Sequence, residues 1–204
     1  MLEKLARHYY QIALVDPLVK LIGHSVSSIS VTLLAGLFGV FFIPFLLTGH
    51  IIWAVACLLF SGYLDTLDGS LARYQNNSTP LGSVLDIMTD RVVEFCVIFA
   101  FYLVDPVQHG LAVILMLGSI LLCITSFLVV GVFTPNDSDK SFHYSPGLIE
   151  RAEAFAFFIA MTLVPTYFEL LAFIFSGLVM LTAIIRLLQF AKLQQKRRLG
   201  HFGA

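Results

Sequence analysis

The amino-acid sequence predicts an all-α membrane protein, with six transmembrane helices preceded by a short interfacial amphipathic helix. Composition, the spacing of apolar runs and the placement of cations predict this fold class. Of the 204 residues, 58% are apolar and 12% are charged, and the mean hydropathy is +0.90. Soluble domains are about 45–50% apolar and about 25% charged. A spanning helix takes about 20 residues, so six such helices leave no room for a second, soluble domain.

Six apolar runs follow one another, separated by short breaks that contain Gly, Pro or Asn. The runs cover residues 29–48, 51–73, 81–104, 107–133, 148–165 and 167–190. The longest break, residues 134–147, holds several Pro, Asn and Asp residues and is expected to be a loop. Before the first run, residues 2–15 place apolar side chains at helical spacing. That spacing predicts the short helix in the membrane interface.

The Lys and Arg residues predict the orientation of the spans. The three loops around Gly49, Pro106 and Pro165 contain no Lys or Arg. By the positive-inside rule, both termini then lie in the cytoplasm. The expected organisation is an N-terminal interfacial helix and linker (1–24), a six-helix transmembrane domain (25–191) and a basic cytoplasmic tail (192–204). The net charge of −1 gives no bias toward nucleic acid.

Four aspartates stand out because they fall within two otherwise apolar runs. Asp65 and Asp68 are three residues apart on the second span, and Asp86 and Asp90 are four residues apart on the third. Each pair therefore projects from one face of its helix. A short turn joins the two spans as antiparallel neighbours, so both pairs lie near the cytoplasmic end. A carboxylate at membrane depth is costly unless something compensates its charge.

Converging carboxylates form an all-oxygen site, and hard divalent ions such as Mg²⁺ or Mn²⁺ prefer these ligands. Two ions fit the charge better than one, and a two-metal site stabilises the entering and leaving oxygens of a displacement at phosphorus. Gly69 and Gly82 would let a ligand approach closely. Ala72 keeps the wall low, and Arg73 can bind phosphate oxygens with two donors. These residues favour a phosphate-bearing substrate.

The run from residue 65 to residue 90 reads Asp-x-x-Asp-Gly-x-x-Ala-Arg, then eight residues, then Gly-x-x-x-Asp-x-x-x-Asp. It resembles the full signature of the CDP-alcohol phosphotransferase family, also called CDP-alcohol phosphatidyltransferases. The resemblance implies a six-helix membrane bundle, usually a homodimer, that binds two divalent ions and a CDP-linked alcohol, typically CDP-diacylglycerol. Its fixed positions are filled here by Asp65, Asp68, Gly69, Ala72, Arg73, Gly82, Asp86 and Asp90.

The resemblance also implies a reaction. Asp90 is expected to be the catalytic general base that deprotonates an acceptor hydroxyl; the alkoxide then attacks the phosphate that carries the lipid, and CMP leaves. The expected metal ligands are Asp65, Asp68, Asp86 and Asp90. The expected contacts to the CDP group are Asp65, Gly69, Ala72, Arg73 and Gly82.

The acceptor is expected to be a small, water-soluble alcohol, a polyol or polyol phosphate. Arg151 and its neighbours at the start of the fifth span resemble a pattern of the phosphatidylinositol-phosphate-synthase branch, and Arg186 lies where that branch keeps an arginine. We therefore expect Arg151 and Arg186 to bind the acceptor phosphate. Ala154 departs from the branch pattern, and residues 27–32 depart from the family's Pro-Asn-x-x-Thr-like segment. The sequence does not rank inositol phosphate, glycerol phosphate, serine and choline as acceptors.

Other interpretations stay open at this point. A membrane prenyltransferase also presents Asp pairs to Mg²⁺ and a diphosphate, and a divalent-cation transporter could use buried carboxylates. Arg91 and Glu94 either form an ion pair that orients the third span or contact substrate. The expected partners are the CDP-diacylglycerol donor, the alcohol acceptor, membrane lipids and a second copy of the chain, in a bacterial inner membrane. The Cys and His residues lack the spacing of zinc ligands.

Overall fold

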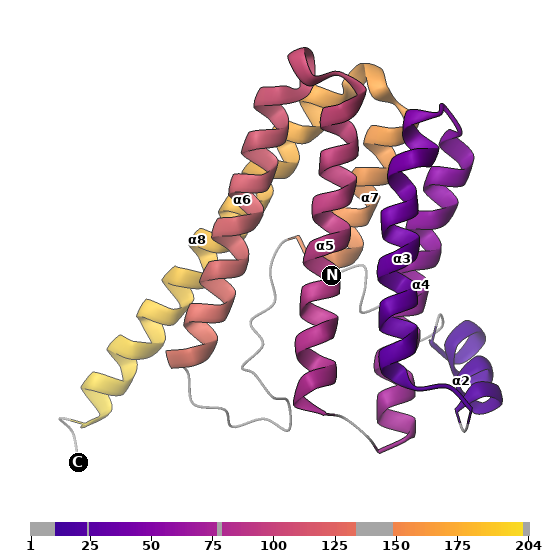
Figure 1. Ribbon diagram of the computed structural model, residues 1–204. Coiled ribbons are helices and arrows are strands. Elements are labelled where there is room, and N and C mark those ends of the chain that lie inside the picture. The colour runs from indigo at the N-terminus through magenta and orange to yellow at the C-terminus, as the bar shows by residue number, and fades with distance from the viewer. Residues whose placement is uncertain (1–10, 24, 77–78, 134–148, 202–204) are drawn as a thin grey trace. The chain divides into compact units, whose positions relative to one another are not determined.

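The computed structural model describes residues 11–23, 25–76, 79–133 and 149–201, and this part of the chain is helical with no strand (Figure 1). The six apolar runs predicted from the sequence all form helices. The elements in order are η1 (Gln11–Val15), α2 (Asp16–Ile22), α3 (Ser28–Leu47), α4 (Ile51–Tyr74), α5 (Pro80–Val104), α6 (Pro106–Phe133), α7 (Arg151–Leu163), η2 (Pro165–Tyr167) and α8 (Phe168–His201).

Among the described residues, four helical segments are long and apolar enough to cross a membrane. α7 falls short because it has 13 residues. α5 has 25 residues but contains four charged side chains within its length. The all-helical membrane class is confirmed, whereas six spans stay a prediction. The four segments are Ser28–Leu47, Ile51–Tyr74, Pro106–Phe133 and Pro165–Gln195.

The chain forms two compact units, one ending at Gly110 and the other beginning at Leu111. In the first unit, α3 packs against both α4 and α5. Two glycines make the α3–α5 approach close. A Cβ added to Gly36 would lie 2.8 Å from Thr89 Cγ2, and a Cβ added to Gly39 would clash with the Val93 side chain. Small residues at such positions allow helix backbones in a membrane protein to approach each other.

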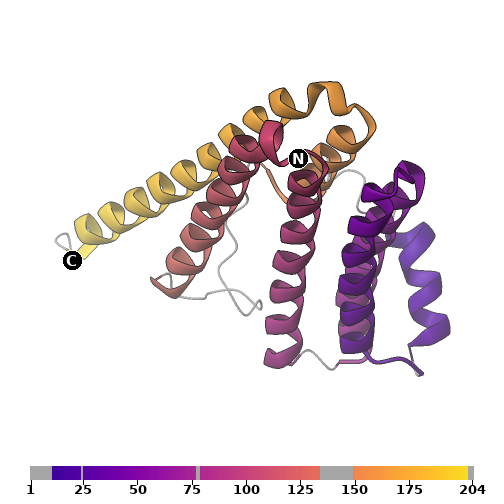
Figure 2. The same ribbon diagram turned by 45° about the horizontal axis from the view of Figure 1, so that its top comes forward.

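Turns and caps set where the helices of the first unit begin. Gly49 has φ +77 between α3 and α4, a conformation that glycine adopts without strain. Thr79 caps α5 by accepting a hydrogen bond of 3.0 Å from the Gly82 N–H, and Pro80 occupies the first turn. α4 and α5 consequently run in opposite directions on either side of a short connection, as predicted (Figures 1 and 2).

The predicted interfacial helix covers residues 2–15, and residues 1–10 lie outside the described part. Its described remainder is η1, and the interfacial helix stays a prediction; η1 and the following α2 both pack against α4. Val15 and Val19 are buried in a cluster with Leu71 of α4. Gln75, at the end of α4, donates hydrogen bonds of 2.9 Å and 2.8 Å to the carbonyls of Gly23 and Val26. This segment is therefore anchored to α4 by both apolar and polar contacts.

In the second unit, α7 packs against α8, with the Phe158 and Phe175 rings 5.5 Å apart. Glu150 and Glu153 form a capping box that begins α7. α8 continues to His201, so most of the predicted tail at 192–204 belongs to this helix. The predicted loop at 134–147 lies outside the described residues.

Candidate active site

Three aspartates from two helices meet within the first unit. Asp65 and Asp68 come from α4, and Asp86 comes from α5. Each offers a carboxylate oxygen, and these atoms all lie within 4.8 Å of one another. Asp68 is 4% exposed, and the other two are partly buried. The structure thus brings together three of the four predicted metal ligands.

A threonine from α3 completes the surroundings of Asp68. Thr32 Oγ1 donates a hydrogen bond of 2.5 Å to Asp68 Oδ2, and it also lies 3.1 Å from the Ser28 carbonyl. Thr32 is itself 4% exposed. Sequence reasoning missed this contact, because residues 27–32 depart from the family pattern and the partner lies 36 positions away. The threonine fixes the orientation of the most buried carboxylate in the cluster.

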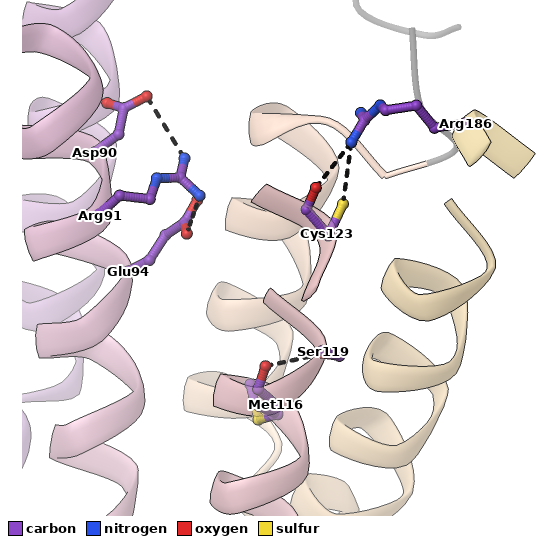
Figure 3. A network of polar contacts seen from close by, with 7 residues as sticks. All are labelled: Asp90, Arg91, Glu94, Met116, Ser119, Cys123 and Arg186. Carbon is purple, nitrogen blue, oxygen red and sulfur yellow. Dashed lines mark hydrogen bonds and ion pairs between the residues drawn. The ribbon is translucent and has the colours of Figure 1, made fainter. Parts of the chain in front are cut away.

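The fourth aspartate, Asp90, lies outside the cluster of three and beside Arg91 (Figure 3). Arg91 Nη2 is 3.8 Å from Asp90 Oδ2, and Arg91 Nη1 donates a hydrogen bond of 2.6 Å to Glu94 Oε2. Glu94 is 6% exposed. Of the two interpretations of Arg91 and Glu94, the structure shows the ion pair.

The predicted CDP-contacting residues lie on α4 and at the start of α5. A Cβ on Gly82 would lie 3.2 Å from Thr79 Oγ1. The absence of a side chain at Gly82 therefore leaves room for the Thr79 hydroxyl that caps α5. Gly69 and Ala72 are partly buried on α4. Arg73 is exposed and donates a hydrogen bond of 3.0 Å to Ser70 Oγ. It borders a cavity of about 260 Å³, whose other lining residues are Gln11, Asp16, Val19, Lys20, Ser70 and Tyr74.

The two predicted acceptor-binding arginines both belong to the second unit. The Arg151 guanidinium lies 5.2 Å from the centre of the Phe155 ring. Arg186 is 9% exposed, and its Nη1 donates hydrogen bonds to the Cys123 carbonyl at 2.9 Å and to Ser126 Oγ at 3.1 Å. Figure 3 shows this contact with Cys123 on α6. Arg186 is thus anchored by α6.

The chemistry of the aspartate cluster fits a hard divalent cation. Its donors are carboxylate oxygens, which Mg²⁺ and Mn²⁺ prefer. Three such groups at this separation repel one another, and burial raises the cost of leaving the charge uncompensated. All three donors project from helices, which position the residues of a site more precisely than loops do.

A protein-family model described as CDP-alcohol phosphatidyltransferase matches residues 28–189, which contain the aspartates and most of both units. The chain belongs to this family. It is therefore a CDP-alcohol phosphatidyltransferase, and family membership favours this activity over prenyl transfer or cation transport.

Two curated relatives show how far the similarity extends along the chain. The inner membrane protein YnjF of Escherichia coli is 34% identical over 162 residues, which cover 76% of this chain and 78% of the relative. A phosphatidylinositol phosphate synthase of Corynebacterium glutamicum is 29% identical over 108 residues, 52% of this chain and 48% of that enzyme. The matched segment thus spans about half the length of the synthase.

The fold of this phosphatidyltransferase also matches a solved structure. The crystal structure of the Mycobacterium tuberculosis phosphatidylinositol phosphate synthase with CDP-DAG bound aligns with a TM-score of 0.72 at 17% identity. The alignment covers 87% of this chain and 93% of the synthase chain. Together with the candidate spans, the similarity to an inner membrane protein indicates an integral membrane protein.

Proposed function

We propose that this phosphatidyltransferase moves the phosphatidyl group of CDP-diacylglycerol to a hydroxyl of a small, water-soluble acceptor and releases CMP, in phospholipid biosynthesis. The observation that carries the proposal is the cluster of Asp65, Asp68 and Asp86, built from the two helices that hold the family signature. The donor is amphiphilic and the acceptor is soluble, so the reaction belongs at the membrane surface. The signature lies around the α4–α5 turn, which we place on the cytoplasmic side.

The relatives support the choice of donor, metal and acceptor class. The Mycobacterium tuberculosis synthase has been solved with CDP-DAG bound and also in complex with manganese and citrate. The Corynebacterium relative is a phosphatidylinositol phosphate synthase. We therefore propose CDP-diacylglycerol as donor, two Mg²⁺ or Mn²⁺ ions as cofactors, and a polyol or polyol phosphate as acceptor.

The residues of the site have separate roles in the transfer: metal binding and removal of a proton. Asp65, Asp68 and Asp86, with Asp90, would hold the two ions, and Thr32 fixes Asp68. When bound, such ions supply positive charge that stabilises the attacking and leaving oxygens. Asp90 takes the proton of the acceptor hydroxyl. The acceptor oxygen forms a bond to the phosphorus that bears diacylglycerol, the phosphoanhydride bond breaks, and CMP leaves with its electrons.

Arg151 and Arg186 would bind the phosphate of a phosphorylated acceptor. An arginine within an apolar helix requires anionic or dipolar partners, and its planar donors match phosphate oxygens. Arg186 is anchored to α6 through Nη1. Arg151 stands at the first turn of α7, where the helix N-terminus adds a favourable field for an anion. Gly69, Ala72, Arg73 and Gly82, with Asp65, would contact the CDP group.

The proposed setting is a homodimer in a bacterial inner membrane, with both termini in the cytoplasm. The Escherichia coli relative is an inner membrane protein, and the cation-free outer loops support the orientation.

CMP release in purified, lipid-reconstituted protein tests the proposal. Asp68→Asn and Asp90→Asn are each expected to lower turnover by more than about 100-fold, beyond the usual effect of residues that only support metal ligands. EDTA should abolish release, and Mg²⁺ or Mn²⁺ should restore it. Asp105→Asn is the matched control: Asp105 Oδ1 accepts the Val107 and Gln108 N–H groups, a capping role that Asn can fill. Wild-type turnover in both site variants would contradict the mechanism.

An acceptor screen separates the candidate alcohols. Inositol phosphate, glycerol phosphate, inositol, serine and choline are each supplied with CDP-diacylglycerol and Mg²⁺, and CMP is measured. We expect a phosphorylated polyol to be the best substrate, because Arg151 and Arg186 would bind its phosphate. A preference for serine or choline would overturn the assigned acceptor class while leaving the donor chemistry intact.

A further inference from the structure

Arg91 lies between two carboxylates of α5 and contacts them unequally. Its Nη1 forms a hydrogen bond of 2.6 Å with Glu94, whereas its Nη2 lies 3.8 Å from Asp90 Oδ2 (Figure 3). The first contact is a charge-assisted hydrogen bond. The second is an ion pair that is too long to be a hydrogen bond. The guanidinium therefore forms a hydrogen bond with Glu94 but not with Asp90.

Glu94 lies beyond the family signature, yet it shares a helix face with Asp90, which is four residues earlier. Its side chain is buried within an apolar stretch of α5. A buried carboxylate needs a partner, and removing one member of such a pair leaves the other charge uncompensated. Arg91 supplies the partner, and in doing so its own position becomes fixed.

Arg91 has hydrogen-bonding capacity left over. Its Nε is buried and has no hydrogen-bond partner among the described residues. An unsatisfied buried donor costs free energy, so a guanidinium released from Glu94 would gain by bonding to another acceptor. The Asp90 carboxylate is already within ion-pair distance. A direct hydrogen bond from Arg91 would occupy an oxygen that the proposed mechanism uses for a proton or an ion.

We propose that Glu94 is a positioning residue that holds the Arg91 guanidinium out of hydrogen-bonding contact with Asp90. Glu94 acts on the reaction only through Arg91, and neither residue needs to touch substrate. The inference rests on the role of Asp90 in the proposed function and extends it to a residue outside the signature.

The test compares Glu94→Gln with the double variant Arg91→Gln/Glu94→Gln. The single variant keeps the shape of the side chain but removes its charge, which weakens the hydrogen bond from Arg91 and lets the guanidinium move toward the charged Asp90. We expect its kcat for CMP release to fall about 10–100-fold, the range seen when residues that support a metal ligand are replaced. KM for both substrates should stay within about twofold of wild type, because no substrate contact is lost. The double variant should be more active than Glu94→Gln, since the competing guanidinium is gone.

Binding of Mn²⁺ alone, followed by electron paramagnetic resonance, gives a readout that does not need turnover. Glu94→Gln should weaken Mn²⁺ binding and the double variant should restore it, because Arg91 competes for Asp90 only in the single variant. A wild-type protein that releases no CMP would defeat the proposed function. A wild-type protein that is active, together with a Glu94→Gln protein of unchanged kcat and unchanged Mn²⁺ affinity, would defeat this inference alone.

Stability is measured separately as the melting temperature of the detergent-solubilised proteins. Glu169→Gln, at an exposed position of α8, makes the same chemical change and should leave both kcat and Mn²⁺ binding at wild-type values. If Glu94→Gln does not fold, Glu94→Asp replaces it in the test. This variant keeps the charge with a shorter reach, so it should lower kcat by less than the about 10–100-fold expected for Glu94→Gln. Equal kcat in the double variant and in Glu94→Gln, or a loss confined to KM, would overturn the proposal.

Discussion

Thr32 shows how one hydroxyl can determine the geometry of a carboxylate. Its Oγ1 donates to Asp68 from a neighbouring helix, and both side chains are 4% exposed. Thr32→Val keeps the volume but removes this donor. We expect kcat for CMP release to fall about 10–100-fold, because outer partners of metal ligands have effects of this size. The Mg²⁺ concentration that gives half-maximal activity should rise, because Asp68 would bind the ion less tightly. CMP release over a Mg²⁺ titration measures both quantities.

Thr162→Val provides the matched control for that change. Thr162 is also a buried helical threonine, and its hydroxyl bonds to the Phe158 carbonyl four residues earlier. The same methyl replaces the same hydroxyl there, with no carboxylate involved. Thr162→Val should retain the wild-type Mg²⁺ dependence. Equal losses in the two variants would show that Thr32 supports only the fold.

Gly39 sets the separation of α3 and α5, and α5 carries Asp86 and Asp90. A Cβ at this position would clash with Val93, which is fully buried. We expect Gly39→Ala to cost about 1–3 kcal/mol, the usual range for overpacking a tight core. The melting temperature should fall, and Mn²⁺ affinity should fall with it because α5 is displaced relative to α4.

Gly118→Ala is the control for Gly39→Ala. A Cβ on Gly118 in α6 meets nothing within 4 Å. Alanine is about 1 kcal/mol better than glycine inside a helix, so this variant should be as stable as wild type or more stable. A Gly39→Ala protein with an unchanged melting temperature and unchanged Mn²⁺ affinity would show that α3 and α5 can move apart without cost to stability or to the metal site.

The sequence predicted those features that depend on one helix at a time. Helical spacing alone determines that Asp65 and Asp68 share a face, and a short turn then brings the face of Asp86 to them. Thr32 and Gly39 could not be found this way, because their roles depend on which helix packs against α3. The extension of α8 was missed for another reason: its apolar pattern ends near residue 190, while Lys, Gln, Arg and Leu continue to favour helix.

At the scale of the whole molecule, the membrane topology depends on whether α5 crosses the membrane. Four described segments meet the length and composition of a span, and α5 does not because it carries charged residues of the site. A span that lines an active site can carry charges that face the protein interior rather than lipid. A protein with four spans and a protein with six would both have a cytoplasmic C-terminus when the N-terminus is cytoplasmic. The ends of α5 distinguish them.

We expect α5 to cross the membrane, so that its two ends lie on opposite sides. Leu81 is 61% exposed near its first turn, and Val107 is 96% exposed just after its end. In a variant lacking Cys57, Cys96 and Cys123, a single cysteine is introduced as Leu81→Cys or Val107→Cys. An impermeant maleimide applied to intact spheroplasts should label Val107→Cys at once and Leu81→Cys only after permeabilisation. Protection of both cysteines until permeabilisation would place both ends of α5 in the cytoplasm and remove α5 from the spans.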